Sequence, residues 1–172
     1  MQQVLICAGI AMLVYTGSTA VYAAMFQEYK AAAFEDKKVI ELYEGGMIGK
    51  LEIPRIDISV MVLHGLEEST LVAGAGHVPG TPLPGGDGNV VLAAHRDTYF
   101  RKLEGILPGD LIRTTTARGV YEYIVEWTEI VDPEDTRVME SRGYQELTLI
   151  TCFPFYFVGS APHRFIVHAR PK

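Results

Sequence analysis

Three residues of chemically competent types lie at the ends of apolar, strand-like segments. Cys152 ends the run ELTLITC, His95 ends NVVLAAH, and Arg164 lies at the start of HRFIVHA. A cysteine attacks acyl carbons as its thiolate, an imidazole moves protons, and a guanidinium stabilises a developing oxyanion. These three residue types together are the parts of a thiol acyl-transfer site.

The chemistry of each side chain suggests its role. We expect Cys152 to be the nucleophile and His95 the acid/base, because an imidazole and a cation favour the thiolate and the imidazole can later protonate an amine leaving group. Arg164 stays protonated at physiological pH. Its planar fork can donate two hydrogen bonds to an oxyanion or hold the substrate backbone, and the sequence leaves both roles open.

Four weaker candidates lie close to these residues in sequence. Thr151 could orient substrate through its hydroxyl or backbone, although threonine is also a common strand residue. Phe153 begins the aromatic segment FPFYFVGSAPH, which could form an apolar wall for a peptide or simply pack onto the domain. His77 lies in a Gly-rich segment that could fold near the site. Asp97 could orient His95 or cap a turn.

No metal or other cofactor is expected from the sequence. The histidines and Cys152 do not show ligand spacings such as C-x-x-C or H-x-x-x-H. Calcium needs a cluster of carboxylates, and the candidate residues Glu67, Glu68, Glu126 and Glu129 are scattered. The sequence therefore leaves calcium stimulation open without predicting a site.

The two cysteines lie in different settings. Cys7 belongs to an apolar N-terminal stretch and Cys152 to a strand end, so we expect no disulfide between them. A free cysteine in an oxidising compartment is a liability unless its reactivity is used, which favours a catalytic thiol over a packing residue.

The net charge of -6 and the lack of a basic cluster argue against nucleic-acid binding.

The N-terminal segment predicts a membrane anchor over residues 1–27. It carries no charged side chain, and the 23 residues from Val4 to Phe26 exceed the roughly 20 that cross a bilayer. A cleaved signal peptide is the alternative, with small residues at Ala23 and Ala24, but its apolar region spans only about 7 to 15 residues. The lysines that follow the span do not favour a cytoplasmic N-terminus by the charge rule.

The remaining chain predicts a juxtamembrane helix or linker over residues 28–46 and one domain over residues 47–172. Short β-rich runs separated by Gly/Pro turns indicate a sandwich or barrel. Short helical segments are expected over residues 67–76 and 132–143. The predicted strands are GKLEIPRI, DISVMVLHG, NVVLAAH, DLIRTTT, GVYEYIVEWTEIV, ELTLITC and HRFIVHA.

Strand spacing predicts how two candidates are placed. Cys152 lies at the end of its predicted strand, and Arg164 lies at the start of the next one. If the two strands are neighbours, both side chains lie at the same end, roughly 5 to 10 Å apart.

Several motifs in one order resemble the sortase family of membrane-anchored cysteine transpeptidases. They are TLITC ending on Cys152, Arg164 twelve positions later, and His95 in VVLAAHRDTYF, with GHVPGTPLPGGDGN before it and LEGILPGD after it. The resemblance covers Gly49 to Ala169, and CFPFYFVGSAPHRFIV is most similar to class D. The Asp-Pro-aromatic lid motif of the pilin-polymerising class does not occur between Gln27 and Met47.

This resemblance implies a mainly β fold, a closed sortase-type β-barrel with short helices, preceded by a transmembrane helix. It implies a single-pass cell-membrane protein with an extracytoplasmic catalytic domain. The implied reaction cleaves a C-terminal sorting signal of the Leu-Pro-x-Thr-Gly type after Thr. A Cys152 thioester then passes the protein to an amine of the cell envelope, on a peptidoglycan precursor or a pilin lysine.

Alternative functions follow from the same residues. A thiol endopeptidase would mainly hydrolyse the thioester, and a non-catalytic anchored barrel would only bind peptides. A peptidoglycan L,D-transpeptidase also uses Cys and His in a β-rich domain, but the Ile-Thr-Cys context of Cys152 departs from its Ser-His-Gly-Cys motif.

Overall fold

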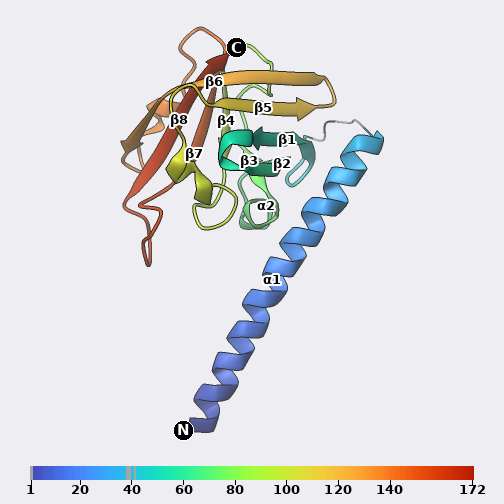
Figure 1. Cartoon of the computed structure of the whole chain (residues 1–172), viewed down its shortest axis with the longest axis vertical. Helices are drawn as coiled ribbons and strands as arrows, with labels where there is room; N and C mark the ends of the chain where they lie inside the picture. Colours follow the sequence, from blue (N-terminus) through green and yellow to red (C-terminus); the bar gives the residue numbers. More distant parts are fainter. Residues whose placement is uncertain (1, 38–39, 41) are drawn as a thin grey trace.

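Within the residues that the structure describes, 2–37, 40 and 42–172, eight β-strands close into a barrel and one long helix, α1 (Gln2–Lys37), runs beside it (Figure 1). The structure is a computed structural model. The predicted fold class, a mainly β closed barrel with short helices, is confirmed.

The barrel consists of β1 (Met47–Ile53), β2 (Ile58–His64), β3 (Ala75–His77), β4 (Asn89–Ala93), β5 (Leu111–Thr116), β6 (Gly119–Val131), β7 (Glu146–Phe153) and β8 (His163–Pro171). Their order around the barrel is β1-β2-β3-β4-β7-β8-β6-β5, and β1 pairs with β5 to close it. The β2–β3 and β4–β7 pairs are parallel and the others antiparallel. Closure leaves no long unpaired strand edge.

Short helices fill some of the connections between strands: η1 (Pro54–Ile56), α2 (Glu68–Ala73), η2 (Arg101–Gly105) and η3 (Thr136–Met139). The helical turn expected within 132–143 is confirmed by η3. The strand predicted to reach Ile56 is wrong at its end, because Pro54 lacks an amide donor and begins η1. The helix predicted over 67–76 is also too long, since Ala75–His77 pairs with two strands as β3.

Alternation along β7 determines which side chains enter the core. Leu147 and Leu149 belong to the main buried cluster inside the barrel. Ile150 and Cys152 therefore project from the opposite, outer face of the wall. The candidate nucleophile lies on the outside of the barrel, where a substrate can approach.

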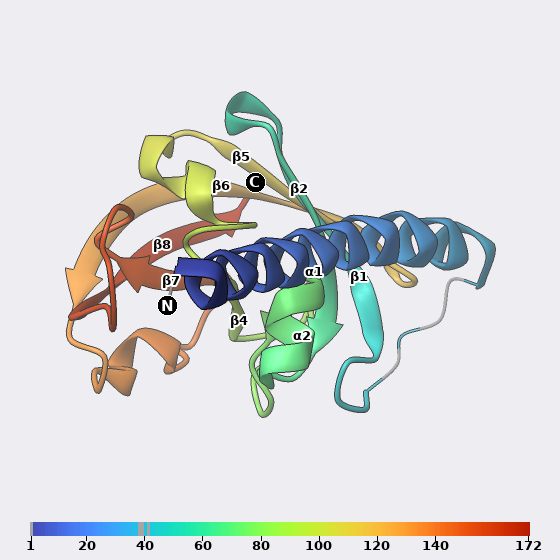
Figure 2. The same cartoon turned by 90° about the horizontal axis from the view of Figure 1, so that it is seen from below.

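Helix α1 lies along the barrel beside α2, while its N-terminus extends far from the strands (Figures 1 and 2). The Gln27 carboxamide joins them, because its Oε1 accepts from the amide of Met61 at 2.7 Å and its Nε2 donates to the Ala73 carbonyl. Phe26 packs on the small cluster that includes Met61 and Leu63.

The sequence of α1 is long and apolar enough to cross a membrane over Gly9–Lys30, a test that a signal sequence would also pass. The helix continues through Gln27 to Lys37, into the segment predicted to be juxtamembrane. Residues 38, 39 and 41 of that predicted segment, Lys38 among them, lie outside the described residues.

Candidate active site

Cys152 and Arg164 lie directly opposite each other on the antiparallel strands β7 and β8. The Cα atoms of opposed residues in such a pair are about 4.5 to 5.5 Å apart, and their side chains project from the same face. Both side chains are half-buried. The structure thus brings the thiol and the guanidinium together at one end of the wall.

His95 reaches the same end through the parallel pairing of β4 with β7. Ala93 pairs with Ile150, and the Ala94 amide donates to the Ile150 carbonyl at 3.2 Å. Continuing this register by two residues beyond the Ala93–Ile150 pair brings His95 toward the level of Cys152. The His95 side chain is 32% exposed, so solvent reaches the imidazole.

Thr151 makes a contact that the sequence did not predict. Its hydroxyl donates to the Ala94 carbonyl at 2.8 Å, and the residue is only 2% exposed. A hydroxyl buried in this way is already bound to the protein backbone. It ties the strand that carries Cys152 to the residue immediately before His95.

The Arg164 guanidinium rests on backbone oxygens of its own loop. Its Nη1 donates to the His163 carbonyl at 3.0 Å and lies 3.5 Å from that of Ala161. Among the described residues no carboxylate forms an ion pair with Arg164. Its positive charge is therefore available to an oxygen that becomes negative during a reaction.

The carboxylate that pairs with His95 belongs to Glu68 of α2, not to Asp97. Glu68 Oε1 lies 3.6 Å from His95 Nε2, and the Glu68 side chain is 81% exposed. An exposed pair of this kind contributes little to stability. No local sequence signal could have linked these two residues, which come from separate elements.

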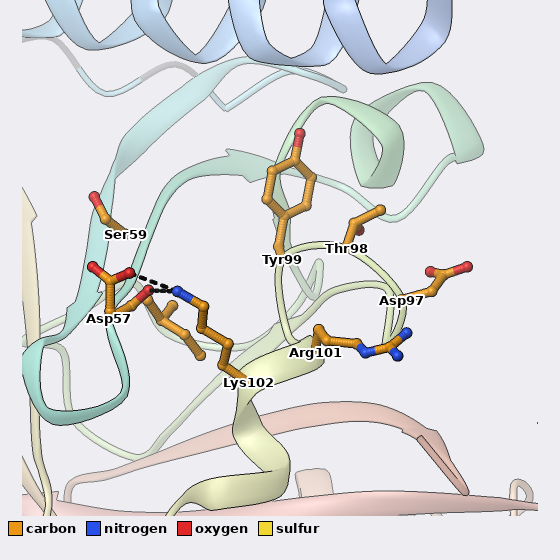
Figure 3. A pocket seen from close by; sticks show the side chains of 8 residues that line it. Asp57, Ser59, Asp97, Thr98, Tyr99, Arg101 and Lys102 are labelled. Atoms are coloured by element: carbon orange, nitrogen blue, oxygen red, sulfur yellow. Dashed lines mark hydrogen bonds and ion pairs between the residues drawn. The ribbon is translucent and has the colours of Figure 1, made fainter. Parts of the chain in front are cut away.

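The segment after His95 borders two hollows. One of about 870 Å³ lies between α1 and the barrel and is lined by residues that include Gln27, Glu68 and His95. The other, of about 380 Å³, lies under Tyr99 and beside the pair of Lys102 and Asp57 (Figure 3).

Side chains of the same segment fasten it to the barrel. Lys102 Nζ lies 2.6 Å from Asp57 Oδ2 and donates to the Asp57 carbonyl at 2.9 Å. Tyr99 donates to the Val72 carbonyl of α2 at 2.9 Å. The chain that follows His95 is therefore held at Tyr99 by α2 and at Lys102 by Asp57.

The aromatic residues after Cys152 divide into two groups. Phe153 and Phe155 pack with Phe165, with ring centroids 5.3 to 6.3 Å apart, and Phe155 belongs to the main core. Tyr156 and Phe157 are exposed. The partly buried Phe153 thus packs against the core, and the two exposed rings present apolar surface to solvent.

His77 lies at the end of β3 and is buried. Its Nε2 lies 2.9 Å from the Pro82 carbonyl, and its Nδ1 lies 3.4 Å from His64 Nδ1. Burial lowers the pKa of His77, which keeps its imidazole neutral at physiological pH. The structure therefore places this weaker candidate in contacts within the barrel.

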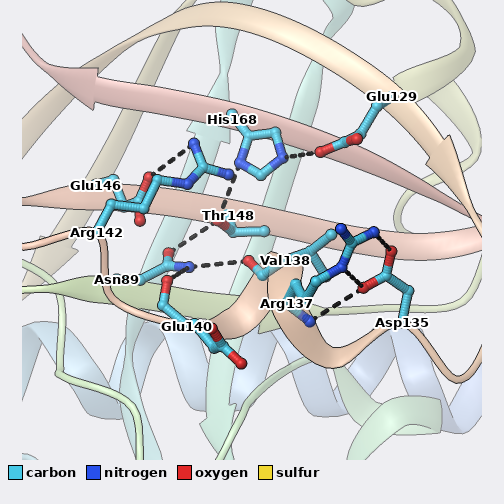
Figure 4. Close-up of polar contacts among 10 residues, drawn as sticks. All are labelled: Asn89, Glu129, Asp135, Arg137, Val138, Glu140, Arg142, Glu146, Thr148 and His168. Atoms are coloured by element: carbon cyan, nitrogen blue, oxygen red, sulfur yellow. Dashed lines mark hydrogen bonds and ion pairs between the residues drawn. The ribbon is translucent and has the colours of Figure 1, made fainter.

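The loop between β6 and β7 is fastened to the outer face that also carries Cys152. Asn89 donates to the Val138 carbonyl at 3.0 Å, and the Thr148 hydroxyl donates to Asn89 at 2.8 Å (Figure 4). Thr148 shares its face of β7 with Cys152 by alternation. This loop thus covers the outer face of β7 around Thr148.

A buried histidine lies beneath the same loop. The His168 ring stacks on Trp127 with centroids 4.5 Å apart, and its Nε2 lies 2.8 Å from Glu129 Oε1. The guanidinium of Arg142, from the loop, lies over the Trp127 ring, 4.9 Å from its centroid. Burial lowers the pKa of His168, so a neutral ring supports the loop.

Comparisons with known proteins are consistent with this geometry. A family model described as the sortase domain matches residues 51–172. Sortase D of Bacillus subtilis is 36% identical over 127 residues, which are 73% of this chain and 64% of that protein. The chain thus spans less than two thirds of the length of this curated relative.

Two solved structures from Clostridium perfringens are similar in fold. A sortase D5 transpeptidase superposes with a TM-score of 0.73 and 25% identity, covering 87% of this chain and 97% of its own. A sortase C with the C-terminal cell wall sorting motif gives a TM-score of 0.70 and 26% identity, covering 77% and 74%.

Proposed function

The chain belongs to the sortase family, whose members are cysteine transpeptidases, and on this premise we propose that Cys152, His95 and Arg164 catalyse transpeptidation. The observation that carries the proposal is the pairing of Cys152 with Arg164 across β7 and β8. A nucleophile and an oxyanion-stabilising cation then lie side by side on an accessible face, with His95 entering from the neighbouring strand.

In the proposed reaction, the Cys152 thiolate attacks the scissile carbonyl carbon. The tetrahedral intermediate collapses as the C–N bond breaks, and the leaving amine takes a proton from the His95 imidazolium. The resulting thioester is attacked by an incoming amine, whose proton returns to His95, and the Cys152 thiolate is released. Arg164 donates hydrogen bonds to the oxyanion in both steps, or holds the substrate backbone.

We propose a C-terminal sorting signal of the Leu-Pro-x-Thr-Gly type as the substrate and an amine of the cell envelope as the acceptor. The acceptor would be a peptidoglycan precursor or a pilin lysine. The similar sortase C whose structure is described with a cell wall sorting motif supports the substrate class. The exposed rings of Tyr156 and Phe157 supply apolar surface for such a peptide beside Cys152.

The proposed function is tested with a Leu-Pro-x-Thr-Gly peptide panel. The full chain in detergent is incubated with each peptide and excess hydroxylamine, and mass spectrometry follows the enzyme and the products. We expect a thioester on Cys152 and a peptide hydroxamate that exceeds the hydrolysed peptide. Hydrolysis alone, at abundant acceptor, would identify a thiol endopeptidase instead, and unmodified peptides and enzyme would favour the non-catalytic binding barrel.

We also propose that residues 1–27 anchor the protein in the cell membrane, with residues 28–46 as the connection and residues 47–172 as an extracytoplasmic catalytic domain. The apolar sequence of α1 and the membrane anchoring typical of the family support this arrangement.

The topology has a direct test. In intact protoplasts or spheroplasts the full chain should sediment with membranes, and protease added outside should digest the barrel. A cytoplasmic marker protein serves as the control for lysis. Protection of the barrel in intact cells, with digestion only after detergent, would reverse the proposed topology.

A further inference from the structure

The loop of residues 154–162 joins Cys152 on β7 to Arg164 on β8. Outside the strands, no backbone-to-backbone hydrogen bond of the described chain falls within these residues. The exposed carbonyl groups of the loop can bind water, and they can also accept hydrogen bonds from a cationic, donor-rich side chain. Side chains from other segments can therefore determine the conformation of this loop.

One guanidinium satisfies three of these carbonyls. Arg96 Nη1 donates to the Pro154 carbonyl at 3.0 Å, and Nη2 donates to the carbonyls of Phe157 at 2.9 Å and Gly159 at 3.1 Å. The bonds reach across 58 to 63 residues of sequence. Hydrogen bonds from a charged donor are roughly twice as strong as neutral ones.

Aromatic contacts add to this attachment. The Arg96 guanidinium carbon lies 5.8 Å from the Phe157 ring centroid, and that of Arg101 lies 4.3 Å from the Tyr156 ring centroid. Such contacts are attractive between a cation and a ring face. The segment that carries both arginines is itself fixed to the barrel by Tyr99 and Lys102.

Arg96 directly follows His95 in the chain, and the loop that it holds separates Cys152 from Arg164. We propose that Arg96 is a positioning residue, which fixes the histidine segment relative to the cysteine and arginine strand ends by binding the carbonyls of residues 154, 157 and 159. This inference rests on the proposed function of the three residues. Arg96 does not contact the reacting atoms in this role.

The kinetic test compares Arg96→Ala and Arg96→Lys with wild type in the full chain. A misplacement of about 1 Å at a reacting centre can lower a rate by about 100-fold, so we expect Arg96→Ala to lower kcat for thioester formation by roughly 10-fold to 100-fold. KM should change little, because the loss is of alignment rather than of peptide binding. Lysine keeps the charge but has one donor nitrogen, so Arg96→Lys should recover only part of kcat.

The matched control is Arg113→Lys. Arg113 lies on β5 and binds Glu122 at 2.9 Å, near the end of β6 that pairs with Pro171 rather than with Arg164. We expect its kcat to equal that of wild type. All rates are referred to the concentration of folded enzyme, taken from the near-ultraviolet circular dichroism of each variant, which removes the effect of misfolded enzyme.

A spin label reports the loop without any catalysis. Val158 is 99% exposed, so a nitroxide on Val158→Cys, in a Cys7→Ser and Cys152→Ala background, should leave the packing intact. We expect Arg96→Ala to narrow the electron paramagnetic resonance lines of the label, and Arg113→Lys to leave them unchanged. If the resonance lines of the label do not narrow in Arg96→Ala, the proposal is overturned. It is also overturned if the lines narrow while the kcat of Arg96→Ala equals that of wild type.

This design separates the inference from the function on which it rests. If the wild type forms no thioester with any peptide, the proposed function fails, while the label still decides whether Arg96 holds the loop. The rate of Cys152 alkylation by iodoacetamide then replaces kcat. A rate that is equal in wild type and Arg96→Ala would overturn the positioning role.

Discussion

Cys152→Ala should abolish thioester formation and lower kcat by on the order of a million-fold, the scale on which loss of a catalytic nucleophile acts in other enzymes. No other described cysteine lies on the barrel, since Cys7 belongs to α1. The fold should persist. Cys152 is half-buried on the outer face, so its truncation should cost well below the roughly 2 to 5 kcal/mol of a core deletion.

The measurement combines mass spectrometry of the acyl-enzyme with a thermal unfolding curve. Cys7→Ala is the matched control, because it removes the other thiol and should leave both acylation and unfolding unchanged. Cleavage of a sorting peptide by purified Cys152→Ala would assign the nucleophile elsewhere. A large drop in the unfolding temperature of that variant would show that the thiol contributes mainly to packing.

Arg164→Lys should slow acylation of Cys152 by on the order of 100-fold to 1000-fold, the usual cost of losing one oxyanion donor. The substitution keeps the positive charge opposite Cys152 but removes the planar pair of donors. Arg164 has no carboxylate partner among the described residues, so no salt bridge is lost with it. The expected loss therefore reports the geometry of the guanidinium fork rather than its charge.

Single-turnover acylation, followed by quenching and mass spectrometry, gives the rate directly. Arg170→Lys on the same strand is the matched control, since Arg170 binds Glu126 at 2.6 Å and is expected to leave acylation unchanged. A decrease in kcat indicates stabilisation of the oxyanion, whereas a rise in KM alone indicates that Arg164 holds the substrate backbone. A Lys variant as fast as wild type would refute the fork.

Local sequence patterns predicted most of the barrel. Alternating β-rich runs between Gly/Pro turns predicted seven of its strands. Cys152 and Arg164 were expected to lie at the same end of neighbouring strands, and they pair directly. The resemblance to sortases, and to class D among them, is confirmed by the matching family model and the sortase D relative. The catalytic roles of Cys152, His95 and Arg164 stay predictions.

Features that depend on tertiary pairing were missed. The three-residue strand β3 is too short and too rich in small residues to show a period, so its first two residues were included in the predicted helix. The contacts of Glu68 with His95 and of Arg96 with the 154–162 loop join distant segments. Long flexible side chains carry no sequence signal for their partners, and only the closed barrel determines what they touch.

In an unfolded chain Cys152 has neither His95 nor Arg164 beside it. The Thr151 hydroxyl and the Ala94 carbonyl that tie these segments together are 57 residues apart in sequence and meet only when β4 and β7 pair. Under the proposed mechanism the thiol is therefore latent until these strands pair, with the ordinary reactivity of any cysteine. The closure of the barrel that completes the fold also assembles the three residues around the nucleophile, and with the proposed topology this happens outside the cytoplasm, where the proposed substrates are.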